Sequence, residues 1–511
     1  MDYFLTFDIG TTSVKTCVFD QQLRMLGHAN GEYLLLADRP GYVELDAETY
    51  VQAVLQGAKE AIARAGINPR HIVSLSCTTQ GETLIPIAQD GAPLARAIVW
   101  LDERASEEAD LLSKQFPAER FYRETGLPEL NGYTPIAKLL WIKNHRPELY
   151  ASTRKFLLLE DYIIFRLTGA CITEKALATS TGWFQLASDG YWDEMLQAAG
   201  IDREKLPELL ECGTVVPAAV LPEIRAALGF SDSVQIVTGA MDQTAGAVGA
   251  GNLSPGILTE TTGTALCLVA TLDTPDLGHP SRVTVYRHIA AERYLMITIS
   301  MTAGMFLKWF KDVFCEPEAR KAEREHRSVY ALFDEIVSTT EPGANGLIAY
   351  PYLNGSLQPH QDASVRGIFF GMGLDSKKEH FLRAIFEGIA CLLRENLELI
   401  EAVNHLRVGE IRSLGGGAKS DVWRQIKADV TQRPIALLAQ SECASLGAAI
   451  LAAVALGYYP DAASAAAKAN AVADYKQPDL TLAPLYDKLY ESYSALYPRL
   501  QPLFDATGRY K

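Results

Sequence analysis

Runs in which apolar, strand-forming residues alternate with polar ones open the chain and recur near its middle. YFLTFDIG and TTSVKTCVFD occupy residues 3–20, and GILTETTG and TALCLVAT occupy residues 256–271. Each pair meets at a turn rich in Gly and Thr, which is typical of a β-hairpin. Two such hairpins half a chain apart predict two halves of similar topology that face one cleft.

The segments between the hairpins predict an α/β fold. HIVSLSCTTQGET (residues 71–83) and SVQIVTGAMDQ (residues 233–243) are typical of buried strands that end in polar loops, where α/β proteins commonly place functional residues. Apolar residues at helical spacing predict helices over residues 135–150 and 383–403. Residues 407–435 predict a strand, a triple-Gly turn and a helix.

Length and composition favour a large globular protein. The 511 residues, 48% hydrophobic and 21% charged, exceed the ~250–300 residues of one ordinary core. We therefore predict two domains, residues 1–250 and 251–511, with the last helices packing back between the lobes. The net charge of −15 disfavours nucleic acid and anionic membranes as partners.

Targeting and metal-binding patterns do not stand out. The most apolar run, residues 444–457, is shorter than the ~18–20 residues that cross a bilayer, so we expect a cytoplasmic protein. The eight cysteines and nine histidines are dispersed without C-x-x-C or H-E-x-x-H spacing. Neither a disulfide framework nor a zinc site is expected.

The first hairpin turn, DIGTTSVK, suits a phosphate. Gly10 permits a turn whose backbone N–H groups converge on an anion. Hydroxyl and ammonium donors follow it, and the preceding carboxylate could hold hydrated Mg²⁺; these residues are Thr11, Thr12, Ser13, Lys15 and Asp8. The alternative is an ordinary hairpin with a polar turn.

Two further segments suit a nucleotide. The turn of the second hairpin repeats the pattern with Thr262, Gly263 and Thr264, although threonine is also common in strands. In SLGGGAKSDVW, three glycines after a strand would let a flat adenine or ribose lie against the backbone, with Ser420 and Asp421 available as helix caps. The alternative is a strand-to-helix turn that needs one left-handed residue.

Asp242 is the single carboxylate of GAMDQTAGAVGAG. It would suit a helix N-cap, which is the structural alternative. The small residues around it would also leave room for a substrate, and a carboxylate within reach of an alcohol can accept its proton during phosphoryl transfer.

TTQGETL and WLDERA predict a polar wall for a polyol or sugar. Each buried hydroxyl of such a ligand needs fixed partners beside an aromatic face, and the candidates are Gln80, Glu82, Trp100, Asp102 and Arg104. The alternative is a solvated loop that carries an ordinary charge pair.

Over nearly the whole chain these motifs resemble the FGGY carbohydrate kinases. FDIGTTSVKTCVFD and LTETTGTA resemble the two phosphate segments of that family, and SLGGGAKSDVWRQIKADV resembles its adenosine segment. YTPIAKLLWIKNH and GIFFGMGLDSKKEHFLRAIFE fit its two long signatures. The resemblance implies two ribonuclease-H-like domains of the actin and heat-shock ATPase superfamily, which close over ATP, Mg²⁺ and a sugar, and it implies a homodimer.

Residue by residue, the resemblance makes Asp242 the catalytic base. The remaining positions divide into the sugar site (Gln80, Gly81, Glu82, Trp100, Asp102, Arg104, Gln243), the nucleotide site (Thr11, Thr12, Ser13, Lys15, Thr262, Gly263, Thr264, Gly416, Gly417, Lys419) and the Mg²⁺ site (Asp8).

The resemblance is less specific about the substrate. Glycerol kinases carry Gln-Arg-Glu-Thr where this chain has Gln80-Gly81-Glu82-Thr83, and xylulokinases usually show Gln-Met-His-Gly there. MDQTAGAVGAG and WLDERA look more like the xylulokinase branch, and glycine in place of arginine is expected to open room for a longer substrate. We expect D-xylulose first, with glycerol, ribulose, gluconate and erythritol as alternatives. A nucleotide-dependent binding module and a sugar-sensing pseudo-kinase are the competing classes.

Overall fold

The computed structural model describes residues 1–290 and 292–507. The chain divides into two compact units, each built from three separated segments. Unit 1 comprises Met1–Leu253, Asp273–Leu295 and Glu442–Ala471; unit 2 comprises Ser254–Leu272, Met296–Ser441 and the residues from Val472 on. The predicted division at residues 250 and 251 stays a prediction about the domains.

A five-stranded sheet forms the centre of unit 1. Its order is β14 (Gln235–Met241), β6 (Ile72–Thr79), β1 (Tyr3–Ile9), β2 (Ser13–Phe19) and β3 (Met25–Glu32). β1 pairs antiparallel with β2 and parallel with β6, which in turn is parallel to β14. The strands with the longest apolar runs, β6 and β14, are almost wholly buried, as expected for parallel strands covered on both faces.

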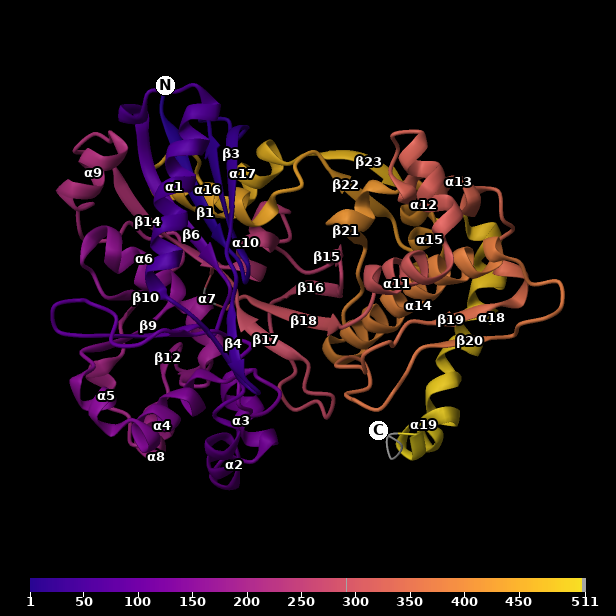
Figure 1. Cartoon of the computed structure of the whole chain (residues 1–511), viewed down its shortest axis with the longest axis horizontal. Helices are drawn as coiled ribbons and strands as arrows, with labels where there is room; N and C mark the ends of the chain where they lie inside the picture. Colours follow the sequence, from indigo (N-terminus) through magenta and orange to yellow (C-terminus); the bar gives the residue numbers. More distant parts are fainter. Residues whose placement is uncertain (291, 508–511) are drawn as a thin grey trace. The chain divides into compact units, whose positions relative to one another are not determined.

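Helices from distant parts of the sequence cover this sheet. α1 (Ala47–Ala65) packs on β2 and β3, whereas α16 (Cys443–Ala455) packs on β1, β6 and β14 (Figure 1). Because α16 comes from the last segment of unit 1, the first strands of the chain are covered by residues more than 400 positions away.

Close backbone contact joins α16 to α10 (Asp242–Gly249). A Cβ atom on Gly249 would lie 1.9 Å from the carbonyl oxygen of Cys443, and one on Gly447 would lie 1.9 Å from that of Ala245. Gly249 and Gly447 are therefore required for helix packing, a reason for small residues that the sequence-based interpretation did not include. A Cβ on Gly246 would meet no protein atom within 4 Å.

The rest of unit 1 is a smaller sheet with helices. β4 (Leu36–Arg39), β5 (Tyr42–Leu45), β8 (Ala97–Ile98), β7 (Leu84–Ile87) and β9 (Lys155–Leu158) form this sheet in that order. The helix predicted from Pro135 begins there, but α4 (Pro135–His145) ends early and α5 (Pro147–Ser152) follows. Pro147 separates the two helices because it lacks the N–H that a continuous helix needs.

Unit 2 repeats the strand order of unit 1. β18 (Tyr294–Ser300, most of it in unit 2), β16 (Leu266–Leu272), β15 (Ile257–Thr262), β21 (Glu410–Leu414), β22 (Ile435–Leu438) and β23 (Val472–Lys476) are neighbours in that order. β15 pairs antiparallel with β16 and parallel with β21, as β1 does with β2 and β6. The predicted similar topology of the two halves is thus confirmed.

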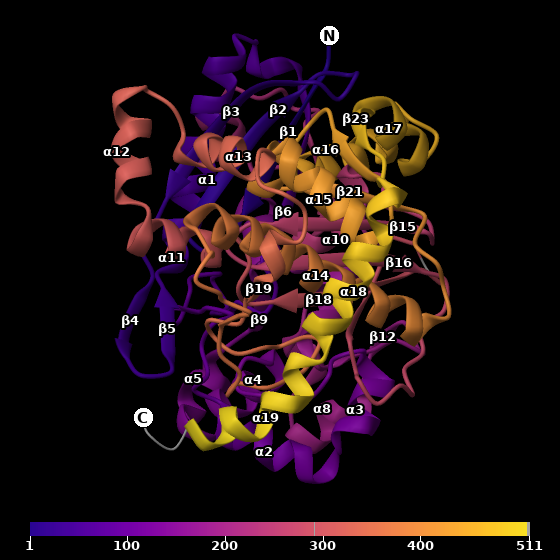
Figure 2. The ribbon, with the colours of Figure 1, turned by 90° about the vertical axis from the view of Figure 1, so that its right-hand side faces the viewer.

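Long helices line unit 2. α14 (Lys378–Asn404) packs against α15 (Asp421–Thr431), α13 (Val329–Ser338) and α11 (Gly304–Phe314). α18 (Ala483–Ser494), near the end of the chain, packs on α14 and α15 within the same unit (Figure 2). In the described part of the chain, no helix has both the length and the apolar character needed to span a membrane.

Candidate active site

Asp242 lies at the junction of a buried strand and a helix. β14 ends at Met241, and α10 begins at Asp242 itself, so the residue occupies the first helical position and Met241 takes the place of the cap. The side chain is half-buried, and its Oδ1 atom accepts a hydrogen bond of 2.6 Å from the N–H of Gln243. The carboxylate is thus fixed by the helix start without being its N-cap.

Neighbouring carboxylates change the acidity of Asp242. Burial raises its pKa to about 7, and the charges of Asp8 and, more weakly, Glu82 add to this rise. The charges of Asp8, on β1, and Glu82, in the loop after β6, therefore act on Asp242 at the start of α10. A carboxyl group with a pKa near neutrality is well matched to accept a proton at neutral pH.

The first hairpin turn brings Asp8 opposite Lys15. The two residues are partners in the β1–β2 ladder. Burial raises the pKa of Asp8 to about 6, while Lys15 lowers it and Glu442 raises it. The ammonium of Lys15 forms an ion pair with Glu442, which directly precedes α16 and was not recognised from the sequence.

Within the turn itself, Gly10 N–H donates to Ser13 C=O at 2.9 Å and Thr12 is exposed. Thr11 accepts a 3.0 Å hydrogen bond from the indole N–H of Trp100. Trp100 also donates its backbone N–H to Thr83. The predicted sugar wall and the predicted phosphate turn therefore contact each other directly.

Gln80 and Gly81 lie buried where β6 ends. The side-chain amide of Gln80 donates to Thr83 at 3.1 Å and to Tyr50 at 3.4 Å, while its buried Oε1 has no protein partner. A Cβ on Gly81 would lie 3.1 Å from Ser180 Oγ and 3.5 Å from Met241 Sδ. The space beside Gly81 is thus occupied by protein, contrary to the expectation that glycine opens room for substrate.

Lys138, from α4, binds the backbone of the two segments that form the predicted sugar wall. It is fully buried, and its ammonium donates to the carbonyls of Val99 at 3.0 Å and of Glu82 and Trp100 at 3.3 Å. Burial lowers the pKa of Lys138 and raises that of Glu82, and the two charges oppose these shifts. The sequence did carry a signal, since a lysine on the apolar face of a predicted helix needs buried partners.

Asp102 and Arg104 are committed mainly to each other. Asp102 is fully buried and accepts from the guanidinium of Arg104 at 2.7 and 2.8 Å and from Val43 N–H at 2.6 Å. Arg104 also bonds Glu44 and lies over the Tyr42 ring. This pair therefore supports the predicted sugar wall from within the protein. Gln243, the last predicted sugar residue, is half-buried next to Asp242 in the chain.

The predicted nucleotide residues of unit 2 line one cavity of about 540 Å³. All six contribute to it: Thr262, Gly263, Thr264, Gly416, Gly417 and Lys419. Tyr330, Phe386 and Trp423 give the cavity aromatic surface, and Lys308 and Asp334 add charge. A concave site with apolar walls and a few polar groups is typical of a ligand pocket.

The triple-glycine turn gives this cavity a flat wall. Gly415 has a φ of 75°. A Cβ on Gly417 would lie 2.7 Å from Cβ of Thr262, so only glycine lets the turn approach β15 this closely. A Cβ on Gly416 would meet no protein atom within 4 Å, which leaves its surface open. Ser420 caps α15 by accepting from Trp423 N–H at 3.0 Å, as its position predicted.

A fully buried ion pair supports the second hairpin turn. Lys427, from α15, donates to Glu260 at 2.7 Å and to Thr262 Oγ1 at 2.8 Å, and Thr262 donates to Glu260 at 2.7 Å. Both charged side chains are completely inaccessible to solvent. The sequence gave no hint of this pair, because its members are 167 positions apart.

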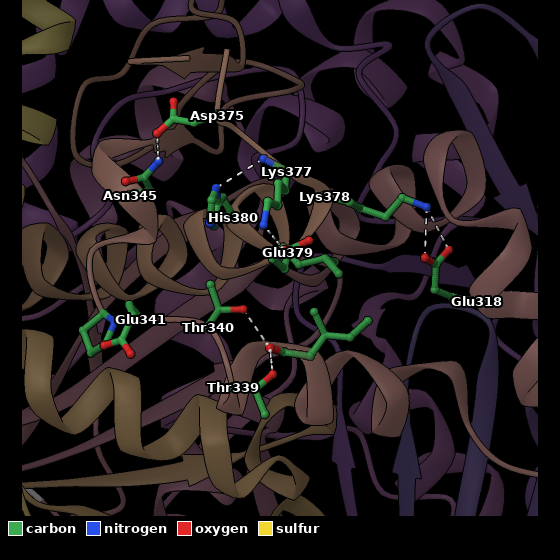
Figure 3. A pocket seen from close by; sticks show the side chains of 13 residues that line it. Glu318, Thr339, Thr340, Glu341, Asn345, Asp375, Lys377, Lys378, Glu379 and His380 are labelled. Atoms are coloured by element: carbon green, nitrogen blue, oxygen red, sulfur yellow. Dashed lines mark hydrogen bonds and ion pairs between the residues drawn. The ribbon is translucent and has the colours of Figure 1, made fainter. Parts of the chain in front are cut away.

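A larger cavity of about 810 Å³ lies elsewhere in unit 2, at the start of α14. Figure 3 shows that its polar side chains pair with one another. Lys378 bonds Glu318 at 2.9 Å, and Asn345 bonds Asp375 at 2.7 Å. None of the predicted site residues lines it, so size alone does not identify the functional site.

Comparison with known proteins decides the family. Residues 3–249 match the N-terminal domain and residues 258–456 the C-terminal domain of the FGGY family of carbohydrate kinases. The chain belongs to this family. FGGY kinases use ATP, and the resemblance seen in the motifs is thereby confirmed.

Individual FGGY relatives are similar over most or all of their length. The chain is 29% identical to the xylulose kinase of Bacillus subtilis (strain 168), over 100% of both chains. It is also 29% identical to the gluconokinase of that organism, over 89% of this chain and 88% of the relative. A ligand-bound xylulose kinase structure from Lactobacillus acidophilus matches with a TM-score of 0.89 and 26% identity over 100% of both chains.

Proposed function

We propose that this FGGY kinase transfers the γ-phosphate of ATP to a hydroxyl of a small neutral sugar. The preferred candidate is D-xylulose, and the product is then D-xylulose 5-phosphate. The observation that carries the proposal is the half-buried carboxyl of Asp242, whose pKa is raised to about 7 next to Asp8 and Glu82. Asp242 is the general base in this proposal.

The reaction needs only one proton transfer by the protein. The sugar hydroxyl donates a hydrogen bond to ionised Asp242, and its oxygen attacks the γ-phosphorus as the bond to the ADP oxygen breaks. The hydroxyl proton passes to Asp242, which releases it to solvent after product leaves. Because the transition state of phosphoryl transfer is loose, the base acts chiefly by orienting the hydroxyl and by accepting its proton late.

The nucleotide is assigned to the glycine-lined cavity of unit 2. The open face at Gly416 would accept the flat adenosine, and the N–H groups of the Thr262–Thr264 turn would bind phosphate oxygens. The turn at Thr11, Thr12 and Ser13, with Lys15, would supply the second set of donors. These roles rest on the open surface at Gly416 and on the two hairpin turns.

Mg²⁺ is assigned to Asp8. Among the described residues no group of three His, Cys, Asp or Glu side chains could hold a metal, which suits an ion that binds through one carboxylate, waters and substrate phosphates. When bound there, the ion would neutralise charge on the phosphates. Asp8 would orient it next to Asp242, whose pKa already responds to the charge of Asp8.

Charge favours a neutral sugar over a sugar acid. Asp8, Glu82 and Asp242 raise the local negative charge. Two neighbouring cations are occupied, Lys138 by three carbonyls and Arg104 by Asp102 and Glu44, and Lys15 is assigned to the phosphates. A substrate carboxylate would therefore meet like charges and no uncommitted cation among these side chains, and this supports xylulose over gluconate.

A screen of ADP release tests the substrate. Xylulose, ribulose, glycerol, gluconate, erythritol and fuculose are compared at equal concentrations with ATP and Mg²⁺. We expect the highest kcat/KM with xylulose and a value for gluconate at least about tenfold lower, because one unfavourable charge contact amounts to about 1.4 kcal/mol or more. A preference for gluconate would contradict the neutral-sugar assignment. ADP release that no sugar changes would instead favour a nucleotide-dependent binding module.

An Asp242→Asn variant tests the base. General-base catalysis contributes about 10²–10⁴-fold, so kcat should fall by that factor while ATP binding stays unchanged. Asp461→Asn, at an exposed N-cap of α17 (Ala462–Ala469) in the same unit, is the matched control and should retain wild-type kcat. Wild-type turnover by Asp242→Asn would refute the proposed role. The homodimer and the cytoplasmic location implied earlier stay predictions.

A further inference from the structure

The outer edge of β14 ends in an unusual way just before Asp242. β14 is the last strand of its sheet, and on its other side residues 213–216 hydrogen-bond to the backbone of Ile236 and Thr238. Its ladder with β6 shifts register between Val237 and Ala240. At this shift a Cβ on Gly239 would lie 1.6 Å from the carbonyl oxygen of Cys77. The strand end is therefore irregular, and its path has to be fixed by other contacts.

Two buried carboxylates bind the N–H groups at this edge. Gly239 N–H donates to Glu160 Oε1 at 2.9 Å, and Met241 N–H donates to Glu174 Oε1 at 3.0 Å. Glu160 comes from α6 (Leu159–Thr168), and Glu174 ends β10 (Ile172–Glu174). Neither side chain has any solvent exposure. The backbone one residue before Asp242 is thus bound by a carboxylate that lies 67 positions away in the chain.

Glu174 binds more donors than Glu160 does. It also accepts from Leu177 N–H at 2.6 Å, from Ala176 N–H at 2.5 Å and from the thiol of Cys212 at 2.8 Å. It therefore joins the start of α7 (Lys175–Ala178) to the end of β14. Among the residues that the structure describes, Glu160 accepts from Gly239 alone, and its buried Oε2 has no hydrogen-bond partner.

Burying the carboxyl groups of Glu160 and Glu174 costs folding free energy. Within the described residues, neither is in an ion pair with a lysine, arginine or histidine, and an unpaired buried charge destabilises a fold. Burial and the charge of Glu174 raise the pKa of Glu160 well above its usual range. Burial also raises the pKa of Glu174, to about 7, while its hydrogen-bond donors lower it.

We propose that Glu174 is a positioning residue for the reaction: by binding the N–H group of Met241 it fixes the end of β14 and hence the direction of the Asp242 carboxylate. This inference rests on the proposed role of Asp242. Glu174 touches neither substrate in this account and acts only through the backbone that precedes the base.

The same substitution at the two positions separates positioning from general effects of burial. Glu160→Gln replaces a buried carboxyl group by an amide whose oxygen can still accept from Gly239 N–H. Glu174→Gln places an NH₂ group against N–H and S–H donors, so the contacts of α7 and β14 cannot all be kept. A displacement of about 1 Å in a catalytic group can lower the rate by about 100-fold.

We expect kcat of Glu174→Gln to fall by about 10–100-fold, with KM for sugar and for ATP within about threefold of wild type, and kcat of Glu160→Gln to stay within about threefold. Circular dichroism at the assay temperature reports the folded fraction, and kcat is referred to folded protein. A folded Glu174→Gln with wild-type kcat, or equal losses in the two variants, would overturn the inference.

A second variant decides the case in which Glu174→Gln does not fold. Glu174→Asp keeps the charge and withdraws it by one methylene, which lengthens the contact to Met241. A drop in kcat at unchanged KM supports positioning, and wild-type kcat refutes it. Asp242→Asn, assayed in parallel, separates the two proposals. If Asp242→Asn is fully active, the proposed function fails. If Asp242→Asn is inactive while folded Glu174 variants turn over normally, only the positioning role fails.

Discussion

The hairpin of β1 and β2 and the hairpin of β15 and β16 occupy the same place in two sheets of the same strand order, yet they treat charge in opposite ways. In unit 1 the charges beside the turn, Lys15 and Glu442, are each 34% exposed. In unit 2 the corresponding charges, Glu260 and Lys427, are 0% exposed. The same strand order thus carries a turn whose neighbouring charges are partly exposed in unit 1 and a turn whose neighbouring charges are fully buried in unit 2.

The difference teaches which charges can take part in chemistry. A partly exposed ion pair contributes little to stability and can exchange its partner for a substrate. A sealed pair cannot be separated without leaving a buried charge behind, so it can only shape the backbone. We therefore read the first hairpin as a source of reactive groups and the second as a rigid cradle of N–H groups.

Replacing Lys427, the fully buried cation of unit 2, should have the largest effect. Lys427→Met leaves Glu260 buried and unpaired, which should lower the free energy of unfolding by about 3–5 kcal/mol. Urea denaturation of the purified protein measures this loss. The double variant Glu260→Gln with Lys427→Met should recover much of it, and a loss below about 1 kcal/mol in the single variant would contradict the sealed-pair interpretation.

Removing the exposed cation should affect activity and leave stability nearly unchanged. Lys15→Met should lower kcat/KM for ATP by about 10–100-fold, because a hydrogen bond to a charged group contributes about 1.5–3 kcal/mol. The free energy of unfolding should change by less than about 1 kcal/mol. Glu442→Gln breaks the same pair but keeps the ammonium, so its kcat/KM for ATP should not fall. Equal losses in both variants would mean that the pair itself is required.

Two glycines of the triple-glycine turn allow a matched comparison with a smaller expected effect. Gly417→Ala places a methyl group 2.7 Å from Cβ of Thr262, an atom that side-chain rotation does not move, and should lower the free energy of unfolding by about 1–3 kcal/mol. Gly416→Ala should leave unfolding unchanged and raise KM for ATP, because its methyl group enters the open cavity. Steady-state kinetics and denaturation distinguish the two, and the reverse pattern would exchange their roles.

The smallest effect concerns the position of a pH profile. Protonated Asp242 cannot accept a proton, so with its pKa raised to about 7 the value of kcat should rise with pH and level off above neutrality. Asp8→Asn removes one cause of the raised pKa, so the midpoint of the Asp242 titration, followed by NMR in the protein without Mg²⁺, should move to lower pH. The metal-free protein is used because a bound Mg²⁺ would offset the charge of Asp8. Asp461→Asn should leave the midpoint in place. An unchanged midpoint in Asp8→Asn would show that the two carboxyl groups do not interact.

Local patterns were enough to predict the α/β class, both hairpins and the glycine-lined turn, because turn residues and alternating strands depend on near neighbours. Groups that depend on distant partners were not found: Lys138, Glu442, Lys427 and Glu174. Lys15 and Glu442 are 427 positions apart, for example. The packing of Gly249 on α16 was not found for the same reason, since Cys443 comes much later in the chain.

The position of α16 also bears on how the protein is made. Because this helix covers β1, β6 and β14, the ribosome must have synthesised roughly nine-tenths of the chain before the first strands acquire their cover. Until then the nascent protein exposes an apolar sheet face, the kind of surface that promotes aggregation and recruits chaperones. Transposing residues 442–471 to a position ahead of Met1 would let unit 1 close early during translation.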